Sequence, residues 1–180
     1  MIGLMPVKLT RFQDVPQLTR SGSWECDFPL DYVWLQIENW QTEDGLDINP
    51  DFQRAHVWTE AQQIAWLEFF LRGGKTGRTL YFNHTAWGRT YKGWSVIVDG
   101  KQRLEAIRRL VHNEIPVFGS YLREFTDSLR LTQTIKINMN DLPTRAAVLQ
   151  WYLEFNAGGT PHTNEEIDRV RVLLAAEVGK

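Results

Sequence analysis

The sequence predicts a single mixed α+β domain over residues 1–180. Two observations lead to this prediction. Segments with the period of a helix and segments with the period of a strand are interleaved along the chain, and no low-complexity tract or long linker divides it. With 43% hydrophobic residues, a chain of this length can bury one compact core. We therefore expect one sheet and its helices to share that core.

Charge and composition limit the partners of the protein. A net charge of −2 argues against a protein that coats nucleic acid by bulk attraction, although a local basic groove is compatible with that average. The single cysteine, Cys26, has no partner for an internal disulfide. The N-terminus has no signal-peptide pattern, and no segment approaches the ~20 apolar residues of a membrane helix. We expect a cytoplasmic protein without membrane contact.

The first third of the chain gives the weakest periodicity, and its first 30 residues give none. From Leu30 to Ile37 apolar residues recur at helical spacing, but Val33, Leu35 and Ile37 also alternate. A helix is favoured there, and a strand stays open. Residues 49–58, NPDFQRAHVW, are polar and aromatic without a period, which is typical of an ordered loop.

Two capping boxes mark the starts of helices. Thr59 with Gln62 begins a helix that continues to the stop at Gly73 and Gly74, and Thr163 with Glu166 begins the last helix. The first of these helices is apolar on nearly every side. This pattern indicates packing on more than one face and leaves a homodimer interface open.

Three segments predict strands. Residues 79–83 and 94–99 are short apolar runs, and the second is typical of a strand buried on both faces. Residues 134–140, TIKINMN, alternate apolar and polar side chains, which indicates a half-buried strand. Pro143 then suits the first turn of a helix that ends at the glycines of residues 156–159, NAGG.

A dense polar group, Asp99-Gly100-Lys101-Gln102-Arg103, lies between the second strand and a predicted helix. Backbone N–H groups at a helix N-terminus favour anions, and Gly100 permits a tight turn or the close approach of a ligand. Arg103 can bind a phosphate with two hydrogen bonds, and Lys101 adds a point charge. Asp99 can hold a divalent metal or orient a water. A structural alternative is equally open, in which Asp99 caps the helix and both cations are solvated.

Two other patterns give no support for a site. Residues 73–77, GGKTG, are similar to the end of a Walker A loop, but Phe69 stands where that loop needs a glycine, and a helix leads into it. A glycine-rich helix stop is the simpler interpretation. The 4 histidines have no spacing typical of a zinc site.

Three motifs together resemble a known superfamily. NPDFQRAHVW, VIVDGKQRLEAI and YLEFNAGGTPHTNEEI occur in an order and spacing similar to the ParB/sulfiredoxin-like superfamily, and within it to the N-terminal domain of GmrSD-type modification-dependent restriction enzymes. The resemblance covers about residues 30–176. It implies a small β-sheet surrounded by helices, and a pocket that binds a nucleoside triphosphate with Mg²⁺.

The resemblance also implies roles for individual residues. An aspartate-glycine-glutamine-glutamine-arginine box of that family is tied to nucleotide binding and hydrolysis. It corresponds here to Asp99 and Arg103 as catalytic residues, Asp99 as the metal ligand, and Gly100, Lys101 and Gln102 as nucleotide-binding residues. Lys101 replaces a glutamine, which leaves hydrolysis open.

Two flanking boxes complete the implied site. The upstream box adds Gln53 and Arg54 to the nucleotide-binding residues, with Phe52 in place of a tyrosine, and the downstream box adds Asn156. The chain ends soon after this last box. We therefore expect it to lack both the nuclease domain of GmrSD-type enzymes and the DNA-binding domain of ParB.

Three functions stay open. The first is a nucleotide- or phosphate-binding domain, with or without NTP hydrolysis, that acts in DNA processing or defence between a phage or mobile element and its host. The second is a metal-dependent DNA nuclease that uses Asp99. The third is a non-enzymatic module that binds a nucleic acid or a host or phage protein.

Overall fold

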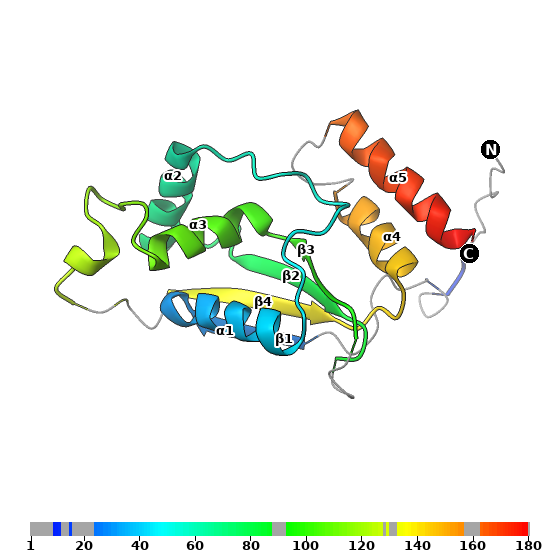
Figure 1. The fold of residues 1–180 in the computed structure, drawn as a ribbon, viewed down its shortest axis with the longest axis horizontal. Coiled ribbons are helices and arrows are strands. Elements are labelled where there is room, and N and C mark those ends of the chain that lie inside the picture. Colours follow the sequence, from blue (N-terminus) through cyan, green and yellow to red (C-terminus); the bar gives the residue numbers. More distant parts are fainter. Residues whose placement is uncertain are drawn as a thin grey trace.

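The computed structural model describes residues 9–11, 15, 24–87, 93–127, 129, 133–156 and 163–179. The mixed α+β class is confirmed (Figure 1). The elements, in chain order, are β1 (Trp24–Pro29), α1 (Leu30–Glu43), α2 (Glu60–Leu71), β2 (Thr79–His84), β3 (Ser95–Asp99), α3 (Lys101–Val111), a 3-10 turn (Leu122–Glu124), β4 (Thr134–Asn140), α4 (Arg145–Asn156) and α5 (Asn164–Val178).

The four strands form one mixed sheet in the order β1-β4-β2-β3. The pair β4 and β2 is parallel, and the two outer pairs are antiparallel. The free edge of β3 is covered by the loop after α1. The N–H of Asp47 donates to the Ser95 carbonyl at 2.9 Å, and the N–H of Ile97 donates to the Asp47 carbonyl at 3.0 Å. This cover satisfies backbone groups that an edge strand would otherwise expose.

The sheet divides the core into two clusters, where the sequence predicted one. On β3, Ile97 belongs to the cluster shared with α1, α2 and α3, whereas Val96 and Val98 belong to the cluster shared with α4 and α5. All three side chains are fully buried, so the prediction of a strand buried on both faces is confirmed. Figure 1 shows α5 alongside α4, and these two helices are in contact.

Local sequence signals located most of the elements. Both predicted capping boxes are present, at Thr59 and Thr163, and the segment after Leu30 is the favoured helix. The apolar face of β4 is confirmed, with Ile135, Ile137 and Met139 buried, but the strand is not half-buried, because Asn138 and Asn140 on its polar face are buried as well. The strand β1 was not predicted.

Two predictions about helices need correction. Pro143 lies before α4 and not in its first turn, because Thr144 caps the helix by accepting a hydrogen bond from the Ala147 N–H at 3.2 Å. In α2, Leu67 and Phe70 are buried, but Phe69 is 45% exposed, so the helix is not covered all round. The glycines predicted to end α4 lie outside the described residues.

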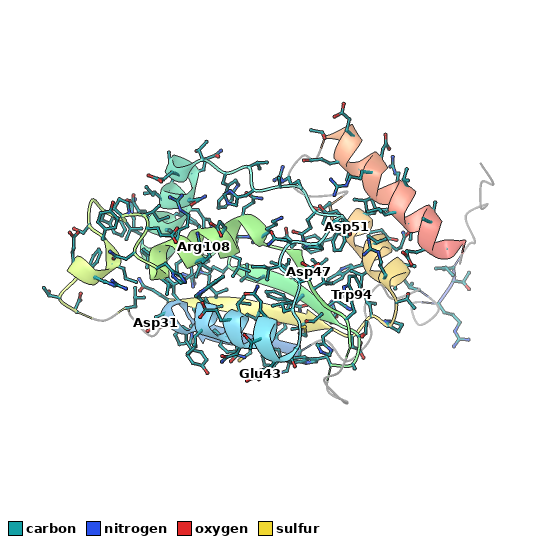
Figure 2. The ribbon with its side chains drawn as sticks, viewed as in Figure 1. Asp31, Glu43, Asp47, Asp51, Trp94 and Arg108 are labelled. Atoms are coloured by element: carbon teal, nitrogen blue, oxygen red, sulfur yellow. The ribbon has the colours of Figure 1, made fainter. Side chains whose placement is uncertain are left out.

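The loop between α1 and α2 is fixed at several points, and it leads into the candidate site. Besides the Asp47 contacts with β3, the carboxylate of Asp51 accepts a hydrogen bond from Arg145 on α4 at 2.7 Å. Figure 2 shows where Asp47 and Asp51 lie beside β3 and α4. Among the described helices, none is long and apolar enough to cross a membrane.

Candidate functional site

A cavity of about 410 Å³ lies where β3 ends and α3 begins. Five segments line it: the loop before α2, α2 itself, the residues before β2, the junction of β3 with α3, and the end of α4. All of the residues singled out in the sequence are in its lining, namely Gln53, Arg54, Asn156 and the complete box from Asp99 to Arg103. The fold thus brings together three motifs that are about 50 residues apart in the sequence.

Gly100 makes the turn from β3 into α3. Its φ is +106°, in the left-handed region that favours glycine, and a Cβ atom at this position would clash with the side chain of Leu80. Gly100 is the N-cap of α3, and no described side chain caps this helix end. The first N–H groups of α3 belong to residues 101–103, which line the cavity, and Gly100 offers them no side-chain acceptor, which favours a bound anion.

Asp99 and Arg103 form an ion pair across the first turn of α3. Their side chains are 32% and 16% exposed, so the pair is partly shielded from water. The structural alternative from the sequence is therefore wrong in two respects. Asp99 does not cap α3, and Arg103 is not a solvated cation.

The ion pair also defines what Asp99 can offer to a metal. Among the described residues, no three His, Cys, Asp or Glu side chains form a cluster that could hold a metal ion. A Mg²⁺ ion at Asp99 would thus take its remaining ligands from phosphate oxygens and water, as Mg²⁺ commonly does at nucleotide sites. Among the described lining residues, Asp99 is the one carboxylate, and its ion pair with Arg103 would compete with such a metal.

The two glutamines of the predicted site bind the backbone. Gln102 Oε1 accepts from the N–H groups of Val57 and Trp58 at 2.9 and 3.1 Å, and its Nε2 donates to the Ala55 carbonyl at 3.2 Å. Gln53 Nε2 donates to the Ile97 carbonyl at 2.8 Å. Both amides therefore hold the loop of residues 53–58 against β3 and α3.

Arg54 and Lys101 supply the remaining positive charge. Lys101 Nζ donates to the Arg54 carbonyl at 3.3 Å, and burial lowers the pKa of Lys101, while the charge of Asp47 opposes this shift. The Arg54 guanidinium has no carboxylate partner in the described part of the chain. Among the described lining residues there are three cations, Arg54, Lys101 and Arg103, and one carboxylate, Asp99. The cavity thus has an excess of two positive charges in a protein of net charge −2.

Aromatic side chains form the rest of the wall. The ring of Trp58, in the loop before α2, lies 6.1 Å from the ring of Trp66 on α2. Tyr152 and Phe155 line the cavity from α4. Burial, with a further contribution from Asp99, raises the pKa of Tyr152 to about 12, so its phenol is neutral at physiological pH. The ring of Phe52 packs edge-on against Tyr152 at 5.2 Å and belongs to the core.

Six lining residues were not among the site residues predicted from the sequence: Trp58, Trp66, Gly77, Val98, Tyr152 and Phe155. The α4 pair had a usable signal, since Tyr152 lies four residues before Asn156 and therefore on the same helix face. Asn156 Nδ2 donates to the Tyr152 carbonyl at 2.7 Å. Gly77 belongs to residues 73–77, for which the sequence analysis rejected a Walker A loop. It lines the cavity, and Lys75 and Thr76 are not among the lining residues.

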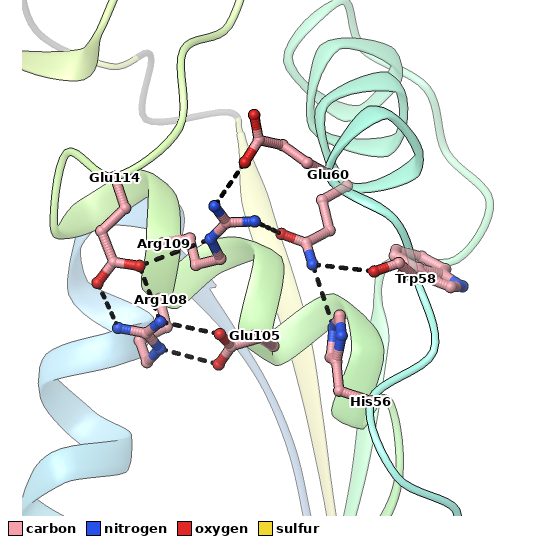
Figure 3. A network of polar contacts seen from close by, with 8 residues as sticks. His56, Trp58, Glu60, Glu105, Arg108, Arg109 and Glu114 are labelled. Carbon is pink, nitrogen blue, oxygen red and sulfur yellow. Dashed lines mark hydrogen bonds and ion pairs between the residues drawn. The ribbon is translucent and has the colours of Figure 1, made fainter.

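A polar network ties α2 to α3 (Figure 3). Arg109 of α3 donates to Gln63 at 2.8 Å and to Glu60 at 2.7 Å, and both of these residues are on α2. The Gln63 amide also lies 3.3 Å from the ring of His56 in the cavity-side loop. The two helices and the loop that line the cavity are therefore tied to one another by side chains outside it.

Comparison with known proteins adds no relative on which to base a function. No family model matches the chain, and neither any curated protein nor any solved structure matches it. The resemblance of its three motifs to the ParB/sulfiredoxin-like superfamily therefore stays a prediction.

Proposed function

We propose that this protein binds a nucleoside triphosphate, or a closely related phosphate-bearing ligand, in the cavity between β3, α3 and α4. The observation that carries the proposal is the excess of positive charge beside an α3 N-terminus that no described side chain caps. Cations and helix N–H groups are the two features of proteins that most often bind phosphate.

The aromatic wall supports a nucleotide over inorganic phosphate alone. A volume of about 410 Å³ is within the range of cavities that bind small ligands, and far exceeds what one phosphate needs. The rings of Trp58, Trp66 and Phe155 in the lining offer flat apolar surface against which a base can pack. The phosphates would then contact Arg54, Lys101 and the start of α3.

Hydrolysis is a further step of the same proposal. Phosphoryl transfer depends mainly on positioning and on charge stabilisation, which Arg103 and Lys101 can supply. Asp99 would bind a Mg²⁺ ion whose other ligands are phosphate oxygens and water, or it would align the attacking water. DNA cleavage has less support, because Asp99 is paired with Arg103 and, among the described residues, is the one carboxylate of the cavity.

Calorimetric titration tests the proposal. ATP, GTP, CTP and UTP, each with Mg²⁺, are titrated into the protein and into the Arg54→Ala variant. At least one nucleotide should bind, and Arg54→Ala should weaken it about tenfold, as expected for the loss of a charged hydrogen bond. Arg171→Ala is the matched control, since Arg171 is 66% exposed on α5 and does not line the cavity.

Two results would contradict the proposal: no heat with any nucleotide, or equal affinity losses in Arg54→Ala and Arg171→Ala. Phosphate release measured on the same samples then separates binding from hydrolysis. If nucleotide binds without phosphate release, the protein is a nucleotide-binding domain and not an NTPase.

A further inference from the structure

We propose that a cavity at the C-terminal end of α2 binds a small apolar carboxylic acid. Its carboxylate would contact Arg72 and Arg78, and its apolar body would pack against Phe118 and Phe125. This cavity of about 500 Å³ is called the second cavity below. It shares no described lining residue with the candidate nucleotide site, so the two sites are independent.

The second cavity has fixed walls. Its described residues come from the end of α2, from Arg78 just before β2, and from the segment between α3 and β4. The Phe118 N–H donates to Glu68 Oε1 at 2.7 Å, and Gln133 Nε2 donates to the Leu71 carbonyl. Because these bonds join both ends of the segment after α3 to α2, the cavity is a feature of the packed fold.

Apolar side chains form most of the lining, and two of them are exposed to water. Six of the eleven described lining residues are apolar. Phe118 and Phe125 are 51% and 42% exposed, whereas Leu122 and Leu129 beside them are partly buried. Exposed rings gain free energy when a ligand removes them from water. The lining therefore favours a ligand with an apolar body.

Two arginines define the charge of the ligand. Arg78 Nε donates to the Gly74 carbonyl, and the guanidinium lies over the Phe70 ring at 4.8 Å from its centroid. These contacts hold the guanidinium without neutralising it. Arg72 is exposed and has no carboxylate partner in the described part of the chain. Asp127 is the one carboxylate of the described lining, so the second cavity has an excess of one positive charge.

The backbone at the end of α2 does not counter this preference for an anion. The last four carbonyl groups of the helix, those of residues 68–71, accept hydrogen bonds from the N–H groups of Arg72, Gly73 and Gly74 and from the Gln133 amide. With these carbonyls satisfied, the groups left for a ligand are mainly donors. A carboxylate is an acceptor that two guanidinium groups can bind together.

The size of the second cavity favours a small molecule over a protein partner. Its volume lies within the range of about 300–1,000 Å³ that is typical of small-ligand sites. A stable protein interface needs about 20–30 residues a side. The described lining has eleven, so a second copy of this chain fits the cavity less well than a small acid does.

Calorimetric titration with octanoate, 1-octanol and octylammonium at neutral pH tests the proposal. The three probes have the same apolar chain and differ in the charge of the head group. Octanoate should bind about tenfold more tightly than octanol, because only the carboxylate gains charged hydrogen bonds to arginine. Octylammonium should bind more weakly than either, since its charge is repelled.

Arg72→Gln should weaken octanoate about tenfold and leave octanol unchanged. Arg123→Gln is the matched control and should change neither, because Arg123 is exposed in the neighbouring 3-10 turn and does not line the cavity. Phe125→Ser should weaken octanoate and octanol alike. In ¹H–¹³C spectra of the unsubstituted protein, the methyl signals of Leu122 and Leu129 should shift with octanoate at the calorimetric dissociation constant.

Four results would overturn the proposal: no binding of octanoate, equal affinity for octanoate and octylammonium, equal losses in Arg72→Gln and Arg123→Gln, or a loss in Arg54→Ala that is absent in Arg72→Gln. The last result would place the acid in the nucleotide site. A dimer in sedimentation that Phe125→Ser dissociates and octanoate does not would assign the cavity to a second copy instead. Nucleotide affinity should be unchanged in Arg72→Gln, so this site and the proposed function can fail separately.

Discussion

Gly100 is the residue on which the turn into the cavity depends most. It combines a φ of +106° with a close approach to Leu80, whereas Gly119 has a φ of +80° and open space where a Cβ atom would be. Alanine at Gly119 should therefore cost only the backbone strain, about 1–2 kcal/mol. Alanine at Gly100 should cost about 2–4 kcal/mol, because the clash with Leu80 adds to that strain. Urea denaturation of both variants measures the difference, and equal losses would show that the contact with Leu80 is unimportant.

Lys101 should give ligand binding a characteristic pH dependence. Because burial lowers its pKa, Lys101 loses its proton at a lower pH than an exposed lysine does. Above about pH 8, where the phosphates are already fully charged, the affinity for tripolyphosphate should fall as the pH rises toward the ordinary lysine pKa. Lys101→Arg should remove this fall, since arginine stays protonated. An alkaline profile that is the same in both proteins would contradict a contact between Lys101 and the phosphates.

At the scale of elements, the loop of residues 53–58 is held by side-chain amides. Gln102→Ala would leave the N–H groups of Val57 and Trp58 without their acceptor, which should cost about 1–3 kcal/mol of unfolding free energy. It should also lower nucleotide affinity, because Arg54 and Trp58 lose their fixed positions. Gln150→Ala is the control, since Gln150 is an exposed glutamine on α4. A Gln102→Ala variant with full stability would show that the loop is held by other contacts.

Elements with local signals could be predicted, and elements defined by distant partners could not. The helices α2 and α5 begin at capping boxes that lie within four consecutive residues. The strand β1 is paired with β4, so that Asp27 lies opposite Lys136, more than 100 residues away. Its side chains are only half-buried or exposed, and its apolar pattern is correspondingly weak. Pairing over that distance is a property of the fold and leaves little trace in the segment itself.

At the scale of the whole molecule, the candidate site was predictable as a set of motifs but not as a geometry. The resemblance of the three motifs to the ParB/sulfiredoxin-like superfamily implied that Arg54, the Asp99–Arg103 box and Asn156 belong to one site, and the fold places all of them around one cavity. The backbone contacts of Gln102 and the convergence of Trp66 with Gly77 depend on how α2 packs against α3. Such contacts follow from tertiary packing, which spacing in the sequence does not encode.

The most direct test of the central claim is a titration of ¹⁵N-labelled protein with the tightest-binding nucleotide and Mg²⁺, followed by backbone amide shifts. The claim predicts that residues 53–58, 99–103 and 152–156 shift together and saturate with a single dissociation constant. Shifts confined to one of these segments would contradict a shared cavity. So would shifts that gather around Phe118 and Phe125, which line a separate cavity of about 500 Å³.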